Sequence, residues 1–231
     1  MNQPQMRRRE WIVHFSACVV SLAAAGGLPR PVAAQGRTEA AAATAKAPRR
    51  IVVLGDSLSA EYGLARGSGW VALLDERLKS QKLGAEVINA SISGDTTSGG
   101  RSRLPALLQQ HRPTHLIIEL GGNDALRGLP LKMTRENLAA MVRAGKEAGA
   151  KVMLVGMQIP PNMGASYGRD FEAGFRTVAQ EEKVPLVPFL LAGVADRADA
   201  AAWFQADRIH PLAKAHPVML DNVWKVLRPL L

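Results

Sequence analysis

Three side chains near opposite ends of the sequence have the types and spacing of a hydrolytic triad. Ser57 lies in the segment GDSLS at residues 55–59, and Asp207 and His210 lie in DRIHP at residues 207–211. A neutral imidazole can take the proton of a serine hydroxyl, and a carboxylate on its other ring nitrogen fixes the tautomer. Each motif alone has another explanation, because Ser is a preferred helix cap and Asp-x-x-His suits a loop hydrogen bond. Together they predict acyl transfer with Ser57 as nucleophile, His210 as base and Asp207 as its partner.

Two further segments supply hydrogen-bond donors for the oxyanion of such a reaction. Gly94 lies in ASISGDTT at residues 90–97, and Asn123 lies in ELGGND at residues 119–124. Glycine lets the backbone approach a ligand closely, so the Gly94 N–H can point inward, and the Asn123 amide is a second donor. With the Ser57 N–H they would form an oxyanion hole. Turn formation also selects these residue types, so neither segment is diagnostic by itself.

Other titratable side chains compete for the same roles. His111 and His115 flank the start of a predicted strand, away from the ligand end, and His216 has no Asp shortly before it. Hard cations prefer clustered carboxylates, and three aspartates follow predicted strands: Asp56, Asp95 and Asp124. We interpret them as caps or loop-bracing groups and predict no metal site. Asp56 and Asp124, with Leu58, are also expected to border the substrate.

The segment at residues 158–168 is the candidate acyl-chain groove. It follows the fourth predicted strand and mixes two prolines and two glycines with apolar residues. A surface loop is the alternative, but a loop at the ligand end with this composition favours a groove. The residues expected to contact substrate are Ile159, Pro160, Met163 and Tyr167.

The elements that position these residues alternate between short apolar runs and longer amphipathic ones. Strands are predicted at residues 51–54, 86–89, 115–120, 151–156 and near 185–187, and helices at 70–78, 98–110, 135–148, 171–182 and 213–227. The apolar runs do not alternate with polar residues, which is typical of parallel strands covered on both faces. This predicts a three-layer α/β/α sandwich, in which ligands bind beyond the carboxyl ends of the strands. A helix is expected directly after Gly55.

The N-terminus has the layout of an export signal. A basic opening, MRRREWI at residues 6–12, precedes an apolar run at 13–25 that is shorter than the about 20 residues of a membrane helix. Cleavage is expected before Gln35, through general secretion or a twin-arginine route suggested by Arg8 and Arg9. An uncleaved anchor and a lipoprotein formed at Cys18 are the alternatives. Residues 35–49 are expected to be a flexible leader, and 50–231 one domain.

Charge and cysteine content exclude several classes of protein. The net charge is +9, and removing residues 1–34 takes away four arginines and one glutamate, which leaves +6. The basic residues are scattered and no run of them is interleaved with aromatics, so we predict no nucleic-acid partner and at most peripheral membrane contact. Cys18 is the only cysteine and lies in the predicted signal, so the mature chain has neither a disulfide nor a thiol nucleophile.

The four motif segments, in their order along the chain, resemble those of the SGNH or GDSL-type hydrolase family. The extended segments at residues 89–96 and 119–128 are similar to the bacterial acyl-CoA thioesterase I, lysophospholipase and arylesterase subfamily. The resemblance implies a flavodoxin-like sheet of five parallel strands and no cofactor. It also implies Ser57 as nucleophile, His210 as base, and Ser57, Gly94 and Asn123 as oxyanion donors.

The resemblance further implies broad substrate tolerance and a periplasmic or secreted enzyme. Acyl thioesters, lysophospholipids and simple esters are cleaved within the subfamily, and we expect a monomer or weak dimer acting on a small-molecule acyl ester. Residues 212–217, LAKAHP, depart from the more polar sequence of the subfamily. Two alternatives are a carbohydrate O-deacetylase, disfavoured by an aromatic content of 5%, and an exported lipid-binding protein, which would not need the whole reactive set.

Overall fold

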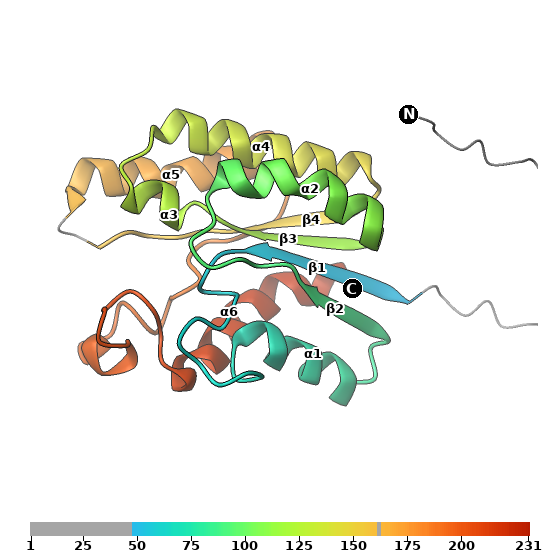
Figure 1. Cartoon of the computed structure of the whole chain (residues 1–231), viewed down its shortest axis with the longest axis horizontal. Helices are drawn as coiled ribbons and strands as arrows, with labels where there is room; N and C mark the ends of the chain where they lie inside the picture. Colours follow the sequence, from blue (N-terminus) through green and yellow to red (C-terminus); the bar gives the residue numbers. More distant parts are fainter. Residues whose placement is uncertain (1–47, 161–162) are drawn as a thin grey trace, which may run out of the picture. The chain divides into compact units, whose positions relative to one another are not determined.

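A computed structural model of the chain describes residues 48–160 and 163–231 (Figure 1). The predicted signal at residues 1–34 and positions 35–47 of the predicted leader lie outside the described residues. The first strand begins at Arg49, one residue before the expected start of the domain. In the described ranges, no helix is both long and apolar enough to cross a membrane.

Five parallel strands form the sheet at the centre of the domain. They are β1 (Arg49–Gly55), β2 (Ala85–Asn89), β3 (His115–Glu119), β4 (Lys151–Val155) and β5 (Leu186–Val187). Their order across the sheet is β2-β1-β3-β4-β5, and every neighbouring pair is parallel. This is the flavodoxin-like strand order, with the switch point between β1 and β3. The predicted α/β class and five-stranded parallel sheet are confirmed.

Helices cover both faces of this sheet, as Figure 1 shows. On one face lie α1 (Trp70–Ser80) and α6 (His216–Leu227), and on the other α2 (Thr97–His111), α4 (Leu131–Glu147) and α5 (Ala165–Glu181). Shorter elements are α3 (Gly122–Leu126) and the 3₁₀ helices η2 (Ala200–Trp203), η3 (Ala213–Ala215) and η4 (Arg228–Leu230). The architecture is therefore the predicted three-layer sandwich.

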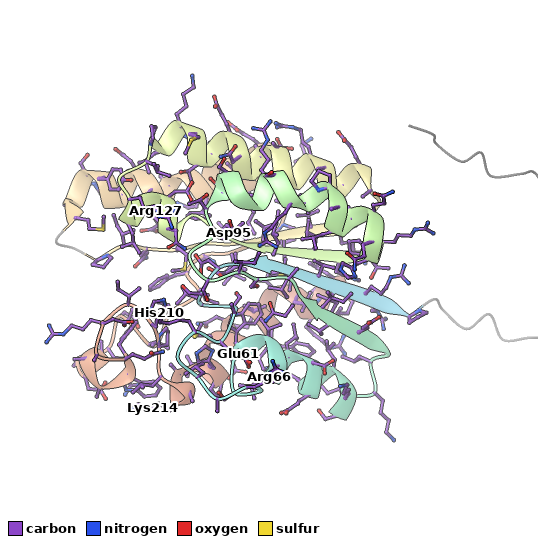
Figure 2. All side chains as sticks on the ribbon, viewed as in Figure 1. Glu61, Arg66, Asp95, Arg127, His210 and Lys214 are labelled. Carbon is purple, nitrogen blue, oxygen red and sulfur yellow. The ribbon has the colours of Figure 1, made fainter. Side chains whose placement is uncertain are left out.

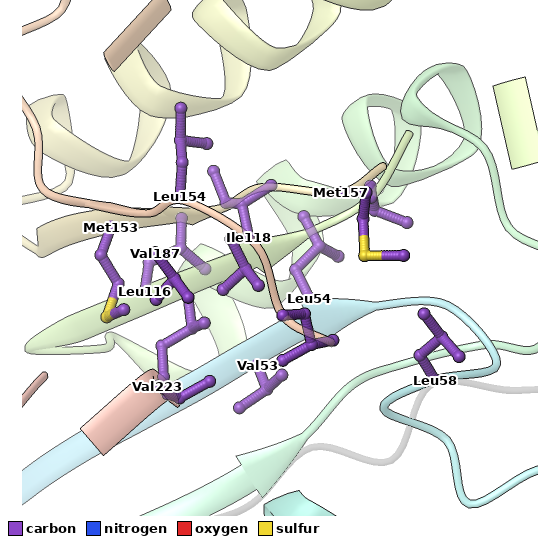
Figure 3. Close-up of a cluster of buried hydrophobic side chains, with 14 of the residues drawn as sticks. Val53, Leu54, Leu58, Leu116, Ile118, Met153, Leu154, Met157, Val187 and Val223 are labelled. Atoms are coloured by element: carbon purple, nitrogen blue, oxygen red, sulfur yellow. The ribbon is translucent and has the colours of Figure 1, made fainter. Parts of the chain in front are cut away.

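The central strands are buried on both faces, which explains their unbroken apolar runs. From Ile51 to Leu54 each side chain of β1 is fully buried, and β3 is buried throughout. Figure 3 shows Val53, Leu116 and Ile118 packed with side chains from the neighbouring strands and from α6. Each such side chain stabilises the fold by about 1.5–3 kcal/mol relative to an exposed position, so this core fixes the strand ends that carry the reactive residues.

Several element boundaries differ from the prediction. The expected helix after Gly55 is wrong, because turns follow β1 and α1 begins only at Trp70. The final helix begins at His216 rather than at residue 213, since Pro217 suits the first helical turn and a 3₁₀ turn precedes it. The helix α5, which corresponds to the predicted helix at residues 171–182, begins at Ala165, six residues before the expected start, and includes part of the predicted groove.

Candidate active site

Ser57, His210 and Asp207 form a continuous chain of contacts beyond the carboxyl end of β1. The Oγ of Ser57 lies 2.9 Å from His210 Nε2, and His210 Nδ1 lies 2.6 Å from Asp207 Oδ2. The half-buried imidazole is therefore held between a hydroxyl and a carboxylate, and Figure 2 shows its place among the surrounding side chains. This is the geometry in which an imidazole can remove a hydroxyl proton.

The turn at residues 207–210 holds the carboxylate and the imidazole in register. Asp207 Oδ1 accepts hydrogen bonds from the backbone N–H groups of Ile209 (2.9 Å) and His210 (3.0 Å), and Arg208 adopts a left-handed conformation at φ 56°. Partial desolvation acts to raise the pKa of Asp207, but the hydrogen bonds from the His210 backbone and ring and from Ile209 outweigh it and lower that pKa to about 2. Asp207 is therefore ionised at neutral pH.

Gln205 ties this turn to the turn that carries Ser57. Its backbone N–H donates to His210 O at 2.8 Å, and its side-chain Nε2 donates to Tyr62 O at 2.9 Å and to Pro211 O at 3.3 Å. The Tyr62 ring lies against the imidazole of His210, with ring centroids 4.3 Å apart. The sequence contained no signal for this link, which depends on two segments that are distant along the chain.

Ser57 is presented by a turn whose support is a pair of buried carboxyl groups. Leu58 N donates to Asp56 Oδ1 at 3.0 Å, and Ser59 Oγ donates to Glu119 Oε2 at 2.7 Å. At Gly55 a Cβ atom would lie 2.8 Å from Glu119 Oε2, so only glycine fits above this carboxyl. Glu119 was not recognised from the sequence, because an acidic residue at the end of a buried strand resembles a turn residue.

Burial shifts the acidity of both carboxyl groups in the same direction. Desolvation raises the pKa of Asp56 to about 6, against hydrogen bonds from Leu58 and Asn123 and the nearby His210, which lower it. Desolvation, and then the charge of Asp56, hold the pKa of Glu119 well above its ordinary value. A neutral Glu119 relieves the repulsion that two buried carboxylates would suffer.

The three predicted oxyanion donors lie in the loops at this edge of the sheet. Asn123 lies in the first turn of the short helix α3, and its Nδ2 donates to Asp56 Oδ2 at 3.1 Å and to Asp95 O at 2.9 Å. Gly94 has a φ of +80°, a conformation that favours glycine, and its carbonyl accepts from Arg127 Nη2 at 2.8 Å. The Asn123 amide is therefore held in a fixed orientation by two protein acceptors.

A largely apolar cavity of about 590 Å³ opens beside Ser57 and His210. Its lining includes Ser57, His210 and Asn123 and four more of the predicted residues: Asp56, Leu58, Ile159 and Pro160. Much of the remaining wall comes from residues 189–204, which carry the lining side chains of Phe189, Leu191, Ala195, Asp196, Ala200, Ala201 and Phe204. Sequence reasoning missed this wall, because the segment has little regular structure and no motif.

Three residues predicted at the substrate lie elsewhere in the structure. Asp124 is fully buried and accepts from Thr97 N at 2.8 Å and from the Thr97 hydroxyl, so it braces the start of α2. Tyr167 lies in α5 and its hydroxyl donates to Leu129 O at 3.3 Å. Met163 precedes α5 and, like the other two, is outside the cavity lining. The early start of α5 removes Tyr167 from the expected loop.

The competing histidines face away from Ser57. His115 Nε2 lies 3.0 Å from Leu230 O, at the opposite edge of the sheet, and His111 ends α2. His216 is 2% exposed, and its Nδ1 accepts from Trp70 N at 3.0 Å. Burial lowers the pKa of His216 to about 4, so this side chain is neutral and is engaged in joining α1 to α6.

Comparison with known proteins gives a consistent result. Residues 53–218 match a family model described as the GDSL-like Lipase/Acylhydrolase family. The chain is 48% identical to Esterase TesA of Pseudomonas aeruginosa over 185 residues, covering 80% of this chain and 90% of that protein. It is 41% identical to Thioesterase 1/protease 1/lysophospholipase L1 of Escherichia coli strain K12, covering 80% and 86%. A crystal structure of TesA, 48% identical, superposes with a TM-score of 0.76 over 79% of this chain and 100% of that chain.

Proposed function

Because the chain belongs to the GDSL-like lipase/acylhydrolase family, we propose that it hydrolyses carboxylic esters and thioesters through an acyl-serine intermediate. The observation that carries this proposal is the unbroken chain from Ser57 through His210 to Asp207 beside an apolar cavity. The relatives named as an esterase and as a thioesterase and lysophospholipase support the same bond specificity.

In the first half of the reaction, Ser57 Oγ attacks the acyl carbon while His210 Nε2 takes its proton. The carbonyl oxygen becomes an oxyanion, which accepts hydrogen bonds from the N–H groups of Ser57 and Gly94 and from the Asn123 amide. The Asn123 Nδ2 group now donates to Asp56 Oδ2 and Asp95 O, and it reaches the oxyanion by giving up or sharing one of these two hydrogen bonds. The bond to the leaving alcohol or thiol then breaks, and His210 returns the proton to it.

In the second half, water hydrolyses the acyl-serine ester. His210 takes a proton from the water as its oxygen attacks the acyl carbon, and the second oxyanion forms at the same donors. Collapse of this intermediate breaks the bond to Ser57 Oγ, which regains a proton from His210, and releases the carboxylic acid. Asp207 remains ionised throughout and stabilises the imidazolium, consistent with its lowered pKa.

The cavity favours substrates with an aliphatic acyl chain. Its wall combines Phe189, Leu191 and Phe204 with Ile159 and Pro160, which offer apolar contacts and few hydrogen-bonding groups. Burial of a methylene group contributes about 0.8 kcal/mol, so each added carbon that fits strengthens binding. Medium or long acyl esters, acyl thioesters and lysophospholipids are therefore the proposed substrates.

We also propose that the enzyme acts outside the cytoplasm after removal of residues 1–34. The basic opening, apolar run and small residues at Val32 and Ala34 support this proposal. N-terminal sequencing of the exported protein should begin at Gln35. A start at Met1 in the membrane fraction would instead indicate an uncleaved anchor.

Hydrolysis of p-nitrophenyl esters from acetate to palmitate tests the proposed activity. The protein lacking residues 1–34 is compared with Ser57→Ala and with Ser80→Ala, a control at the end of α1 whose hydroxyl donates to Arg77 O. We expect turnover that prefers the longer chains, is lost in Ser57→Ala and is retained in Ser80→Ala. Activity confined to acetate would instead favour a deacetylase, and equal turnover in Ser57→Ala would exclude Ser57 as nucleophile.

Covalent labelling identifies the nucleophile independently of the substrate. A fluorophosphonate should add one label to the native protein and none to Ser57→Ala, as read by intact mass and by peptide mapping. Labelling at another serine, or stoichiometric labelling of Ser57→Ala, would overturn the assignment. No serine-dependent turnover and no label together would favour a lipid-binding protein.

A further inference from the structure

Exposed apolar side chains gather at one place on the described part of the molecule. The large apolar residues with 37–53% exposure all come from the segments that follow the carboxyl ends of the strands, four from loops and Leu126 from the end of α3: Tyr62, Ile92, Leu126, Ile209 and Leu212. We call this set the apolar rim. Scattered single exposed apolar residues are ordinary, but a group around one opening marks a binding surface.

Their contacts place these residues around the opening of the cavity. Leu126 and Ile209 belong to the cavity lining, and the Tyr62 ring lies against His210. Ile92 N donates to Gly55 O at 3.0 Å, which fixes it beside the turn that carries Ser57, and Leu212 lies two residues after His210. The rim therefore borders the entrance, with Leu126 and Ile209 in the cavity lining and Tyr62, Ile92 and Leu212 outside it.

Exposed cations accompany the rim on the same connecting segments between strands and helices. Within the described residues, four of them form no ion pair: Arg66, Arg127, Arg208 and Lys214. Figure 2 shows Arg127 and Lys214 on the same side of the molecule as His210.

The carboxylates of these loops are mostly engaged by protein groups. Asp95 is paired with Arg103 at 2.8 Å, Asp199 with Arg197 at 2.8 Å, and Asp207 with His210. Glu61 accepts hydrogen bonds from the N–H groups of Gly67 and Gly69. The surface around the entrance therefore has unpaired positive charge among exposed apolar side chains.

We propose that the apolar rim and its four cations dock the enzyme on anionic lipid surfaces. Apolar side chains on such a surface enter the boundary between headgroups and acyl chains, and each Lys or Arg near an anionic membrane adds about 1 kcal/mol of attraction. The docked orientation points the cavity at the lipid, so an acyl chain can pass from the aggregate to Ser57 without crossing water. A protein partner bound to the rim would cover this entrance, which makes lipid the better fit.

The proposal builds on the proposed hydrolase activity, but docking is measured without turnover. The test protein lacks residues 1–34 and carries Ser57→Ala, so that it does not consume the lipid. Residues Lys46–Leu231 form a compact unit. The match to the solved TesA structure covers the whole of that chain and 79% of this one, so the protein without residues 1–34 is expected to fold alone. Co-sedimentation is measured with vesicles of phosphatidylcholine and with the same vesicles containing phosphatidylglycerol.

Two double variants separate the apolar and the electrostatic contributions. Ile92→Ser with Leu212→Ser removes rim residues outside the cavity, and Arg66→Glu with Lys214→Glu reverses two cations. The matched control, Lys82→Glu with Lys225→Glu, reverses two exposed cations near the C-terminal ends of α1 and α6, at the other edge of the sheet. Thermal unfolding verifies that each variant is folded.

We expect anionic vesicles to bind the protein and neutral vesicles to bind it at least about tenfold more weakly. The apolar variant and the charge-reversal variant should each lose about tenfold or more in affinity for anionic vesicles. The control pair should bind normally, and added salt should weaken binding. When the same substitutions are made in protein that keeps Ser57, its rate of hydrolysis of soluble p-nitrophenyl acetate should be unchanged. Equal binding to both vesicle types, normal binding by both the apolar and the charge-reversal variant, or an equal loss of affinity in the control pair would overturn the proposal.

Discussion

His216 links the packing of two helices to the stability of the protein in acid. It is 2% exposed, and its Nδ1 accepts a hydrogen bond from Trp70 N at 3.0 Å, where α1 begins. Protonation of Nδ1 would abolish this bond and place a charge in the interior. Burial accordingly lowers the pKa of His216 from 6.5 to about 4.

The direction of the pH effect follows from this lowered pKa. Between pH 6.5 and about pH 4, His216 binds a proton in the unfolded chain but not in the native protein. The free energy of unfolding therefore has its full value above 6.5 and decreases as the pH falls through this window. The separation of the two pKa values corresponds to a loss of about 3 kcal/mol.

His216→Asn isolates this contribution, because the amide oxygen can accept from Trp70 N and does not titrate. Urea unfolding of both proteins is measured near neutral pH and near pH 4, with linear extrapolation to water. The wild type should lose about 3 kcal/mol more than the variant over this interval. Asp56 also titrates in this range, because its raised pKa lowers the free energy of unfolding as the pH rises towards about 6. Both proteins contain Asp56, so its effect cancels when their losses of stability are subtracted.

A stability difference that stays constant with pH would refute this reasoning. It would mean that His216 binds its proton equally in the native and unfolded states, so that neither its burial nor its bond to Trp70 controls its charge. A variant that fails to fold at neutral pH is distinguished by its circular dichroism. In that case His216→Gln, which places an amide oxygen one methylene further out, gives the same comparison.

Three further substitutions test the site and its support. Asn123→Ala should lower kcat about 100- to 1000-fold without unfolding the protein, because it removes an oxyanion donor; steady-state kinetics showing near-normal kcat would remove Asn123 from the reaction. Gln205→Ala should lower kcat about tenfold or more with KM nearly constant, since it frees the His210 turn from the Ser57 turn; an increase in KM alone would contradict this. Gly145→Ala should destabilise by about 1–3 kcal/mol with kcat unchanged, because its Cβ would lie 2.7 Å from Val152 Cγ2 and 2.8 Å from Leu116 Cδ2; unaltered denaturant unfolding would show that these side chains move aside freely.

The sheet was predictable because its strands are buried on both faces. Runs of Val, Ile and Leu mark β1, β3 and β4 to within one or two residues, and the order of the motifs indicates which loops meet at one edge. Helix ends were less predictable, because they depend on local capping and on packing. The turns after Gly55 were misread as a helix, since Asp and Ser are also common at helix N-termini.

Residues with a local motif were placed well, and residues that act across the fold were not. The contact between Asp207 and His210 follows from a spacing of three residues, whereas Ser57 reaches His210 only through the fold. Glu119 and Gln205 support both sides of this contact, yet each acts on a segment far away in sequence. Single-sequence patterns contain no record of such long-range bonds.

The wall formed by residues 189–204 has an evolutionary consequence. Apart from the short η2 helix it has little regular structure, and it carries neither Ser57, Asn123, Asp207 nor His210. Loops of this kind accept insertions, deletions and exchanges more readily than strands do. Related enzymes can therefore acquire new preferences for acyl-chain length by changing this segment alone, while the machinery that breaks the bond is inherited intact.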